Sequence, residues 1–410
     1  MASARRDRRL VYLLLAGLAA ALAAQDTVRT GLEGLAWQSP ETVHAAERAL
    51  VTALRAPLLG AKDCAAALQC WFDGRTADAR GDKAAAIAAW EAGTRALTDL
   101  HDLPPPPWPD TSGARLTPQT GITGADLYLL DAFVVRWSSD AGTQFGLFMV
   151  PRSRPQGHRF PLLVYVHGGS AGLGRQEIAW LAEQCRKGYA GLAPALRGQP
   201  LADASVPQMS GYRCAGRTDD PAGAAGDLLA ALQGTQAMPV VRPDGCALVG
   251  VGRGATAALL AAAHSSMPAC VAVADARQLD PFRAYWTRMS RGENTWPDWA
   301  NFCSREPAEQ LASMHRRSVV HQAGGIRCPV LMLLPDGPAD SLDAQAHRDV
   351  AAAVRAAGAE AVPEVQPGAA RDFTDTLDSE PGRKALRRML EFVYRHVPSD
   401  DGKDTLLTPP

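Results

Sequence analysis

The residues with the clearest chemical signature lie in the stretch ALVGVGRGATAALLAA, residues 247–262. An apolar run typical of a buried strand passes through Gly250, Gly252 and Gly254 into a run of helix formers. This spacing is that of G-x-S-x-G, the sharp strand-to-helix turn that presents a nucleophilic serine. The serine position holds Gly252, which has no side chain but adopts the strained backbone of such a turn without penalty. The stretch therefore predicts the turn without its nucleophile.

Alternating strand and helix signals surround this turn and must position it. An antiparallel hairpin is predicted over residues 127–151, around Asp140. Six further strand-like runs follow it: FPLLVYVHGG, GYAGLAPALRG, DGCALVGV, CVAVADA, CPVLMLLPD and AVPEVQPG. Helical stretches separate these runs, and the last helix is PGRKALRRMLEFVYRHV. The alternation predicts an α/β domain over residues 118–398, with an eight-stranded, mostly parallel sheet flanked by helices.

From about residue 118 to 397 the chain resembles the α/β-hydrolase superfamily, in its dienelactone-hydrolase and prolyl-oligopeptidase-like esterase branch. Six landmarks carry the resemblance in family order and at family spacing: SSDAGTQFGLFMVP, FPLLVYVHGG, GYAGLAPALRG, GVGRG, IRCPVLML and QPG. The resemblance implies the α/β-hydrolase fold. It also implies a site built from a nucleophile, a histidine base, an acid and backbone N–H donors for an oxyanion.

The resemblance implies an oxyanion loop directly after the strand FPLLVYV. This loop holds His167, Gly168, Gly169 and Ser170, and Arg253 follows the serine position of the turn. Glycines in such a loop allow the backbone to approach a ligand closely. An ordinary glycine-rich turn after a strand is the alternative interpretation of the same residues.

The histidine base is missing from the place that the resemblance gives it, the loop before the last helix. No histidine lies between His347 and His396, and His396 is at the far end of that helix. In QPGAARDF the position most similar to the family histidine is Arg371. A guanidinium stays protonated and cannot act as a general base.

The acid has several candidates. The resemblance implies an aspartate on the loop after CPVLMLLPD, where Asp336 and Asp340 both lie, and Asp275 in VADA is a position that some relatives use. Without a histidine to orient, each of these carboxylates is equally suited to cap a helix or to pair with Arg371.

Two other groups of residues bear on function. A relocated nucleophile would need a Ser or Cys near a base, and the candidates for these roles are Ser170, Cys214, Cys303, His315 and His321. Aromatic residues concentrate between the sixth and seventh predicted strands, at Phe282, Tyr285, Trp286, Trp296 and Trp299. They form either the wall of a ligand pocket or a small core under a long insertion.

The N-terminal part is predicted to contain three segments. Residues 1–23 have the pattern of a signal peptide, with four arginines, an apolar run and the small-x-small site Ala21-Leu22-Ala23. Residues 24–103 are predicted to be helical, with one helical hairpin that resembles a single tetratricopeptide repeat. Residues 104–117 form a proline-rich linker, and the tail 399–410 is predicted to be disordered. We therefore expect an exported protein, periplasmic or extracellular; an uncleaved membrane anchor is the alternative.

The net charge, the apolar runs and the cysteine spacing limit which partners and cofactors are expected. The net charge of −1 gives no electrostatic basis for binding nucleic acid, and no further apolar run predicts a membrane contact of the mature form. The cysteines lack metal-ligand spacing, so neither a metal nor another cofactor is predicted. The pairs Cys64–Cys70 and Cys214–Cys303 are candidate disulfides whose connectivity the sequence leaves open.

Together these features favour an exported, non-catalytic protein of the α/β-hydrolase type, a pseudoenzyme that binds a small molecule or a protein partner. One alternative is an active carboxylic-ester hydrolase, acting on acyl or carbohydrate esters through relocated residues. A second alternative is an interaction protein that docks a partner through its N-terminal helices, with the α/β domain as scaffold.

Overall fold

The computed structural model describes residues 45–124, 127–218, 220–292, 306–374 and 379–399. The predicted signal peptide lies outside these residues, and so does the predicted tail from residue 400 onward. None of the described helices is long and apolar enough to cross a membrane. The chain divides into two compact units: unit 1 is Met1–Asp102 with Tyr285–Leu311, and unit 2 is Leu103–Ala284 with Ala312–Pro410.

Unit 1 is helical in its described part. Its helices are α2 (Ala45–Ala53), α3 (Arg55–Leu59), α4 (Ala65–Ala79) and α5 (Lys83–Arg95). The helices α4 and α5 pack against each other, and Gly93 makes room for the core, since a Cβ atom there would lie 2.8 Å from Leu50 Cδ2. Residues far along the chain complete the packing, because the indole Nε1 of Trp286 donates to the carbonyl of Val51 at 3.0 Å.

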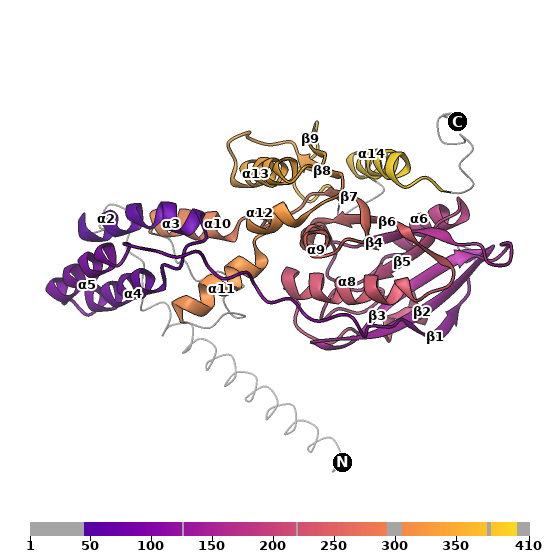
Figure 1. The fold of residues 1–410 in the computed structure, drawn as a ribbon, viewed down its shortest axis with the longest axis horizontal. Helices are drawn as coiled ribbons and strands as arrows, with labels where there is room; N and C mark the ends of the chain where they lie inside the picture. The colour runs from indigo at the N-terminus through magenta and orange to yellow at the C-terminus, as the bar shows by residue number, and fades with distance from the viewer. Residues whose placement is uncertain (1–44, 125–126, 219, 293–305, 375–378, 400–410) are drawn as a thin grey trace, which may run out of the picture. The chain divides into compact units, whose positions relative to one another are not determined.

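Unit 2 contains a sheet of nine strands in the described chain, in the order β1-β2-β3-β5-β4-β6-β7-β8-β9 (Figure 1). The strands are β1 (Thr117–Ile122), β2 (Leu130–Ser139), β3 (Gly142–Pro151), β4 (Phe160–Val166), β5 (Ala190–Pro194), β6 (Val241–Val251), β7 (Pro268–Ala274), β8 (Val330–Pro335) and β9 (Ala361–Gln366). The pairs β1–β2, β2–β3 and β3–β5 are antiparallel, and the remaining pairs are parallel. The eight predicted strands are confirmed, but the predicted number was too low by one, because β1 is an additional edge strand.

Helices cover both faces of this sheet. On one face, α8 (Pro221–Gln236), α9 (Gly252–Ala263) and α13 (Leu342–Ala356) share a buried apolar cluster with the strands. On the other face, α6 (Arg175–Arg186) and α14 (Glu380–His396) complete a second cluster. The short helices α7 (Pro207–Ser210) and α12 (Val319–Gln322) lie in connections, and α10 (Pro281–Ser290) and α11 (Pro307–Arg317) each run across the division between the units.

The proline-rich segment 104–116 packs along α8 in unit 2. A Cβ atom on Gly226 would lie 3.2 Å from Pro109 Cγ, and one on Gly234 would lie 3.0 Å from the backbone nitrogen of Leu116. Trp108 stacks on the ring of His264, with ring centroids 4.2 Å apart. Glycines two helical turns apart on α8 thus let the segment lie against the helix before it enters β1.

Candidate functional site

The strand-to-helix turn is present between β6 and α9. Gly252 follows the last residue of β6 and has a φ of 53°, the left-handed conformation. Its two flanking glycines are required by packing: a Cβ atom on Gly250 would lie 2.8 Å from Ala255 Cα, and one on Gly254 would lie 2.5 Å from the carbonyl oxygen of His167. Real Cβ atoms do not approach other atoms that closely, so the turn needs glycine at both positions. We call residues 250–254 the elbow.

At position 252, glycine is favoured by the left-handed backbone conformation rather than by a lack of space for a side chain. The nearest neighbour of a Cβ atom at this position would be Gly168 Cα, at 3.3 Å. Gly168 in turn must be glycine, because its Cβ atom would lie 2.8 Å from the carbonyl oxygen of Val251. The structure therefore brings the predicted oxyanion loop against the elbow and leaves space for a small side chain on Gly252.

The other residues of that loop differ in exposure. His167 is fully buried, and its Nε2 accepts a hydrogen bond from the backbone N–H of Leu196 at 3.3 Å. Burial lowers the pKa of His167 to about 4, so the ring is neutral at neutral pH. Ser170 and Arg253 are exposed. His167 thus serves as a packed hydrogen-bond acceptor for the neighbouring loop.

The position predicted for the base is on the surface. The guanidinium of Arg371 is 60% exposed and pairs with Asp343 in the first turn of α13, at 3.3 Å. The carboxylate of Asp336 instead accepts the backbone N–H of Gly368 at 2.9 Å, and Asp340 is exposed. The structure therefore brings Asp336 to the loop that carries Arg371, but the side chain of Arg371 pairs with a residue that the sequence did not single out.

An ion-pair cluster ties the same loop to the end of β7. Asp275 is buried and follows Ala274, which pairs with Val251 of the elbow. Its Oδ2 accepts Arg277 Nη2 at 2.6 Å and the backbone N–H of Asp372 at 3.1 Å, while Arg277 also pairs with the Asp372 carboxylate. Burial raises the pKa of Asp275, although the charge of Arg277 opposes this shift.

The geometry of this cluster is strained. Asp275 and Asp372 have φ values of 52° and 68°, a region that L-residues rarely adopt. Strain of this kind persists only where the surroundings hold it in place, and it concentrates at functional sites. Sequence reasoning found Asp275 but missed Arg277 and Asp372; the motif VADAR-x-x-D contains the adjacent arginine, but nothing in it indicates a partner near residue 372.

The candidates for a relocated nucleophile lie in packed surroundings. Cys214 is buried and burial raises its pKa to about 12, so it is a protonated thiol. The rings of His315 and His321 are 6.1 Å apart, and Ser318 Oγ lies 2.7 Å from His321 Nδ1. Ser318 is fully buried, however, and its hydroxyl caps α12. Cys303 lies outside the described residues.

The predicted aromatic pocket residues are divided between the units. Phe282 is fully buried in unit 2, and its ring centroid is 5.0 Å from that of His321. Tyr285 and Trp286 belong to unit 1, where Arg55 stacks over the indole of Trp286 at 5.1 Å. Trp296 and Trp299 lie outside the described residues.

Two further expectations concern cysteines and metals. In the described part of the chain, Cys64, Cys70 and Cys214 are free thiols, so the candidate pair Cys64–Cys70 is wrong: the two residues are six apart at the start of α4 and within it, which places them on different sides of the helix. No group of three or more His, Cys, Asp or Glu side chains suited to a metal ion is found among the described residues.

Comparison with known proteins supports the assignment of the fold. No protein-family model matches the chain, and no curated protein sequence matches it. An acetyl xylan esterase from a Paenibacillus species is similar in structure, with 17% identity over 70% of this chain and 90% of the esterase, and a TM-score of 0.51. An acetyl xylan esterase from a Thermoanaerobacterium species has 16% identity over 69% of this chain and 88% of its own, with a TM-score of 0.48.

An acylaminoacyl peptidase from Pyrococcus horikoshii aligns with 69% of this chain but only 45% of its own length, at 14% identity and a TM-score of 0.47. Sequence identities this low are evidence for a shared fold only. The sheet order, the glycine elbow after β6 and the likeness to the Paenibacillus esterase agree with one another. Unit 2 has the α/β-hydrolase fold.

Proposed function

We propose that this chain is a non-catalytic member of the α/β-hydrolase type, a pseudoenzyme that binds a ligand or a partner outside the cytoplasm. The observation that carries the proposal is Gly252. Its left-handed backbone, with a φ of 53°, has the conformation of a nucleophile elbow, and the residue has no atom that could attack a substrate. The predicted signal peptide supports the location.

The surroundings of the elbow support the same proposal. A hydrolase needs a proton acceptor above its nucleophile, whereas here the corresponding loop carries Arg371 paired with Asp343. Arg277 and two aspartates hold that loop from the other side. Fixed ion pairs hold a surface in one shape, which suits binding, but they supply no group that changes its protonation at neutral pH.

Hydrolysis by relocated residues has less support. The buried thiol of Cys214 and the buried, helix-capping hydroxyl of Ser318 are each closed off from a substrate. Ser170 is exposed, and it is the candidate that an experiment must exclude. Docking of a partner through the helices of unit 1 is a separate alternative to this proposal.

The experiment compares p-nitrophenyl acetate hydrolysis by four forms of the chain: the natural sequence, Ser170→Ala, Gly252→Ser and Gly252→Ser with Arg371→His. We expect the natural sequence and Ser170→Ala to react at the buffer rate. We expect the double variant to show turnover above the single one, because it restores both the nucleophile and a base. Turnover by the natural sequence that Ser170→Ala abolishes would overturn the proposal in favour of a relocated esterase.

A further inference from the structure

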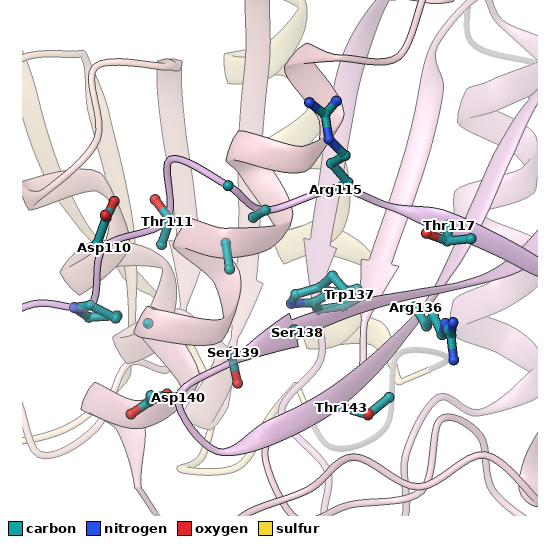
Figure 2. Close-up of a pocket in the computed structure, with 15 residues that line it drawn as sticks. Asp110, Thr111, Arg115, Thr117, Arg136, Trp137, Ser138, Ser139, Asp140 and Thr143 are labelled. Carbon is teal, nitrogen blue, oxygen red and sulfur yellow. The ribbon is translucent and has the colours of Figure 1, made fainter.

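A groove away from the elbow has the features of a binding site of its own. It has a volume of about 830 Å³ and lies in unit 2 between segment 109–117, the end of β2 and α8 (Figure 2). Its apolar lining includes Trp137, Gly226 and Ala230. The elbow lies four strand positions along the sheet, at the end of β6, so roughly 19 Å separates the two sites. The volume is within the usual range for small-molecule sites.

One wall of the groove is an open strand edge. The antiparallel pairing of β1 with β2 begins at Thr117 opposite Arg136. Beyond this point β2 continues through residues 137–139, which pair with β3 on one side. On the other side, no described strand pairs with them, because the chain before Thr117 turns away to lie along α8. An extended peptide can add to such an edge through main-chain hydrogen bonds.

The two ends of the groove carry opposite charges. Figure 2 shows Asp110 and Asp140 on one side of the groove and Arg115 and Arg136 on the other, with the two arginine side chains pointing in opposite directions. Arg115 lies just before Thr117, which pairs with Arg136 at the start of β1, and Asp140 follows the last residue of β2.

The four charged side chains of the groove are in ionisation states that allow them to pair with a charged ligand. No ion-pair partner of the Arg115 or Arg136 guanidinium is found within the part of the chain that the structure describes. A hydrogen bond from the Ser112 backbone lowers the pKa of Asp110. Burial alone would raise the pKa of Asp140, but the hydrogen bond and charge of Arg197 outweigh it and lower the pKa, while the side chain stays 42% exposed. Both carboxylates are therefore ionised at neutral pH.

We propose that this groove binds a short peptide with free termini, about four residues long, as an extra strand on β2. The four residue-to-residue steps from Arg136 to Asp140 span roughly 13 Å in an extended chain, about the end-to-end length of an extended tetrapeptide. The ammonium group lies at the end with Asp110 and Asp140, and the carboxylate lies at the end that Arg115 and Arg136 flank from opposite faces of the sheet. The peptide then runs antiparallel to β2, in line with β1, whose first residue Thr117 closes the carboxylate end.

This inference is independent of whether the elbow is catalytic. The groove and the elbow share no lining residue, and the proposed function would stand if the groove were empty of ligand in solution. Conversely, a peptide can bind here even if the natural chain proves to hydrolyse esters. Failure of the peptide experiment and failure of the esterase experiment are therefore separate results.

The experiment titrates the full chain with tetra-alanine by isothermal calorimetry at two temperatures, so that a vanishing enthalpy cannot hide binding. We expect the peptide with free termini to bind at least about tenfold more tightly than the N-acetylated or the C-amidated form, because each cap removes one charge-assisted contact. Equal binding of free and capped peptides, or no binding at millimolar concentration, would overturn the proposal. Competition by acetate alone at similar strength would also overturn it, since the site would then be one for simple anions.

Variants assign the two ends. Arg136→Gln should weaken binding of the free peptide about tenfold and leave binding of the C-amidated form unchanged. Asp110→Asn should weaken binding of the free peptide about tenfold and leave binding of the N-acetylated form unchanged. The matched control is Arg159→Gln, an exposed arginine before β4 that does not line the groove. Unchanged far-ultraviolet circular dichroism shows that the variants are folded. An equal loss in Arg136→Gln and Arg159→Gln would reduce the effect to net charge and contradict the proposed site.

Discussion

Gly168 Cα lies 3.3 Å from the position that a Cβ atom would take on Gly252. The two residues follow separate strands, β4 and β6, and their closeness sets how the elbow meets the loop after β4. Gly168 cannot carry a Cβ atom without a clash, whereas Gly252 can if the loop yields by a few tenths of an ångström. The elbow thus retains space for a nucleophile that the sequence does not supply.

The glycines of the elbow should respond differently to the same substitution. Gly252→Ser places a side chain in a left-handed conformation with little crowding, so we expect it to lower the free energy of unfolding by about 1–2 kcal/mol. Gly254→Ser pushes a Cβ atom to within 2.5 Å of the His167 carbonyl oxygen, and we expect a loss of about 3 kcal/mol or more. Urea denaturation of both variants measures the difference. An equal loss of unfolding free energy in the two variants would show that packing, and not backbone conformation, requires glycine at position 252.

Arg277 should stabilise the chain through Asp275. Arg277→Gln leaves the buried Asp275 carboxylate without its ion pair, which costs on the order of 3 kcal/mol at pH 7. Because burial already raises the pKa of Asp275, protonation relieves the unpaired charge, and the loss should shrink as the pH falls from neutral into the acid range. Denaturation at a series of pH values tests this. The double variant Arg277→Gln with Asp275→Asn should recover part of the stability at pH 7, and a loss that does not depend on pH would contradict the ion-pair account.

His167 should make stability depend on pH in the acid range. Its pKa falls from the ordinary 6.5 to about 4 in the folded chain, so the unfolded chain takes up a proton first. The stabilisation is complete above pH 6.5 and is lost as the pH falls toward 4, by on the order of 3 kcal/mol. His167→Gln keeps an acceptor for the Leu196 N–H and cannot titrate, so its stability should fall less over this interval. Identical pH profiles of the two forms would contradict this role.

Much of the architecture could be predicted because the signals are local. Apolar runs in the sequence predict the eight strands, and three alternating glycines between a strand and a helix predict the elbow. The additional strand β1 could not be predicted in this way, because five of its six residues are exposed and it contains Pro118 and Gly121. Its place is set by pairing with β2 at the sheet edge, where proline is tolerated.

The functional surroundings of the elbow were harder to predict because they join distant segments. Asp275 and Asp372 are 97 residues apart, and their contact depends on how the loop after β9 folds back. The acid position shows the same difficulty, since the Asp336 carboxylate accepts the backbone N–H of Gly368, whereas the sequence does not distinguish Asp336 from Asp340 four residues later. The groove is built from three elements, none of which carries a motif. Spacing along the sequence predicts a turn well, but it does not predict contacts between loops.

The central claim is that the elbow carries no nucleophile. The most direct measurement is intact-mass spectrometry of the full chain after reaction with a fluorophosphonate, with cysteines blocked beforehand, and with Gly252→Ser combined with Arg371→His as the reference for a restored site. The account predicts an unchanged mass for the natural sequence and a mass increase of one adduct for the reference variant. Stoichiometric labelling of the natural sequence would contradict it.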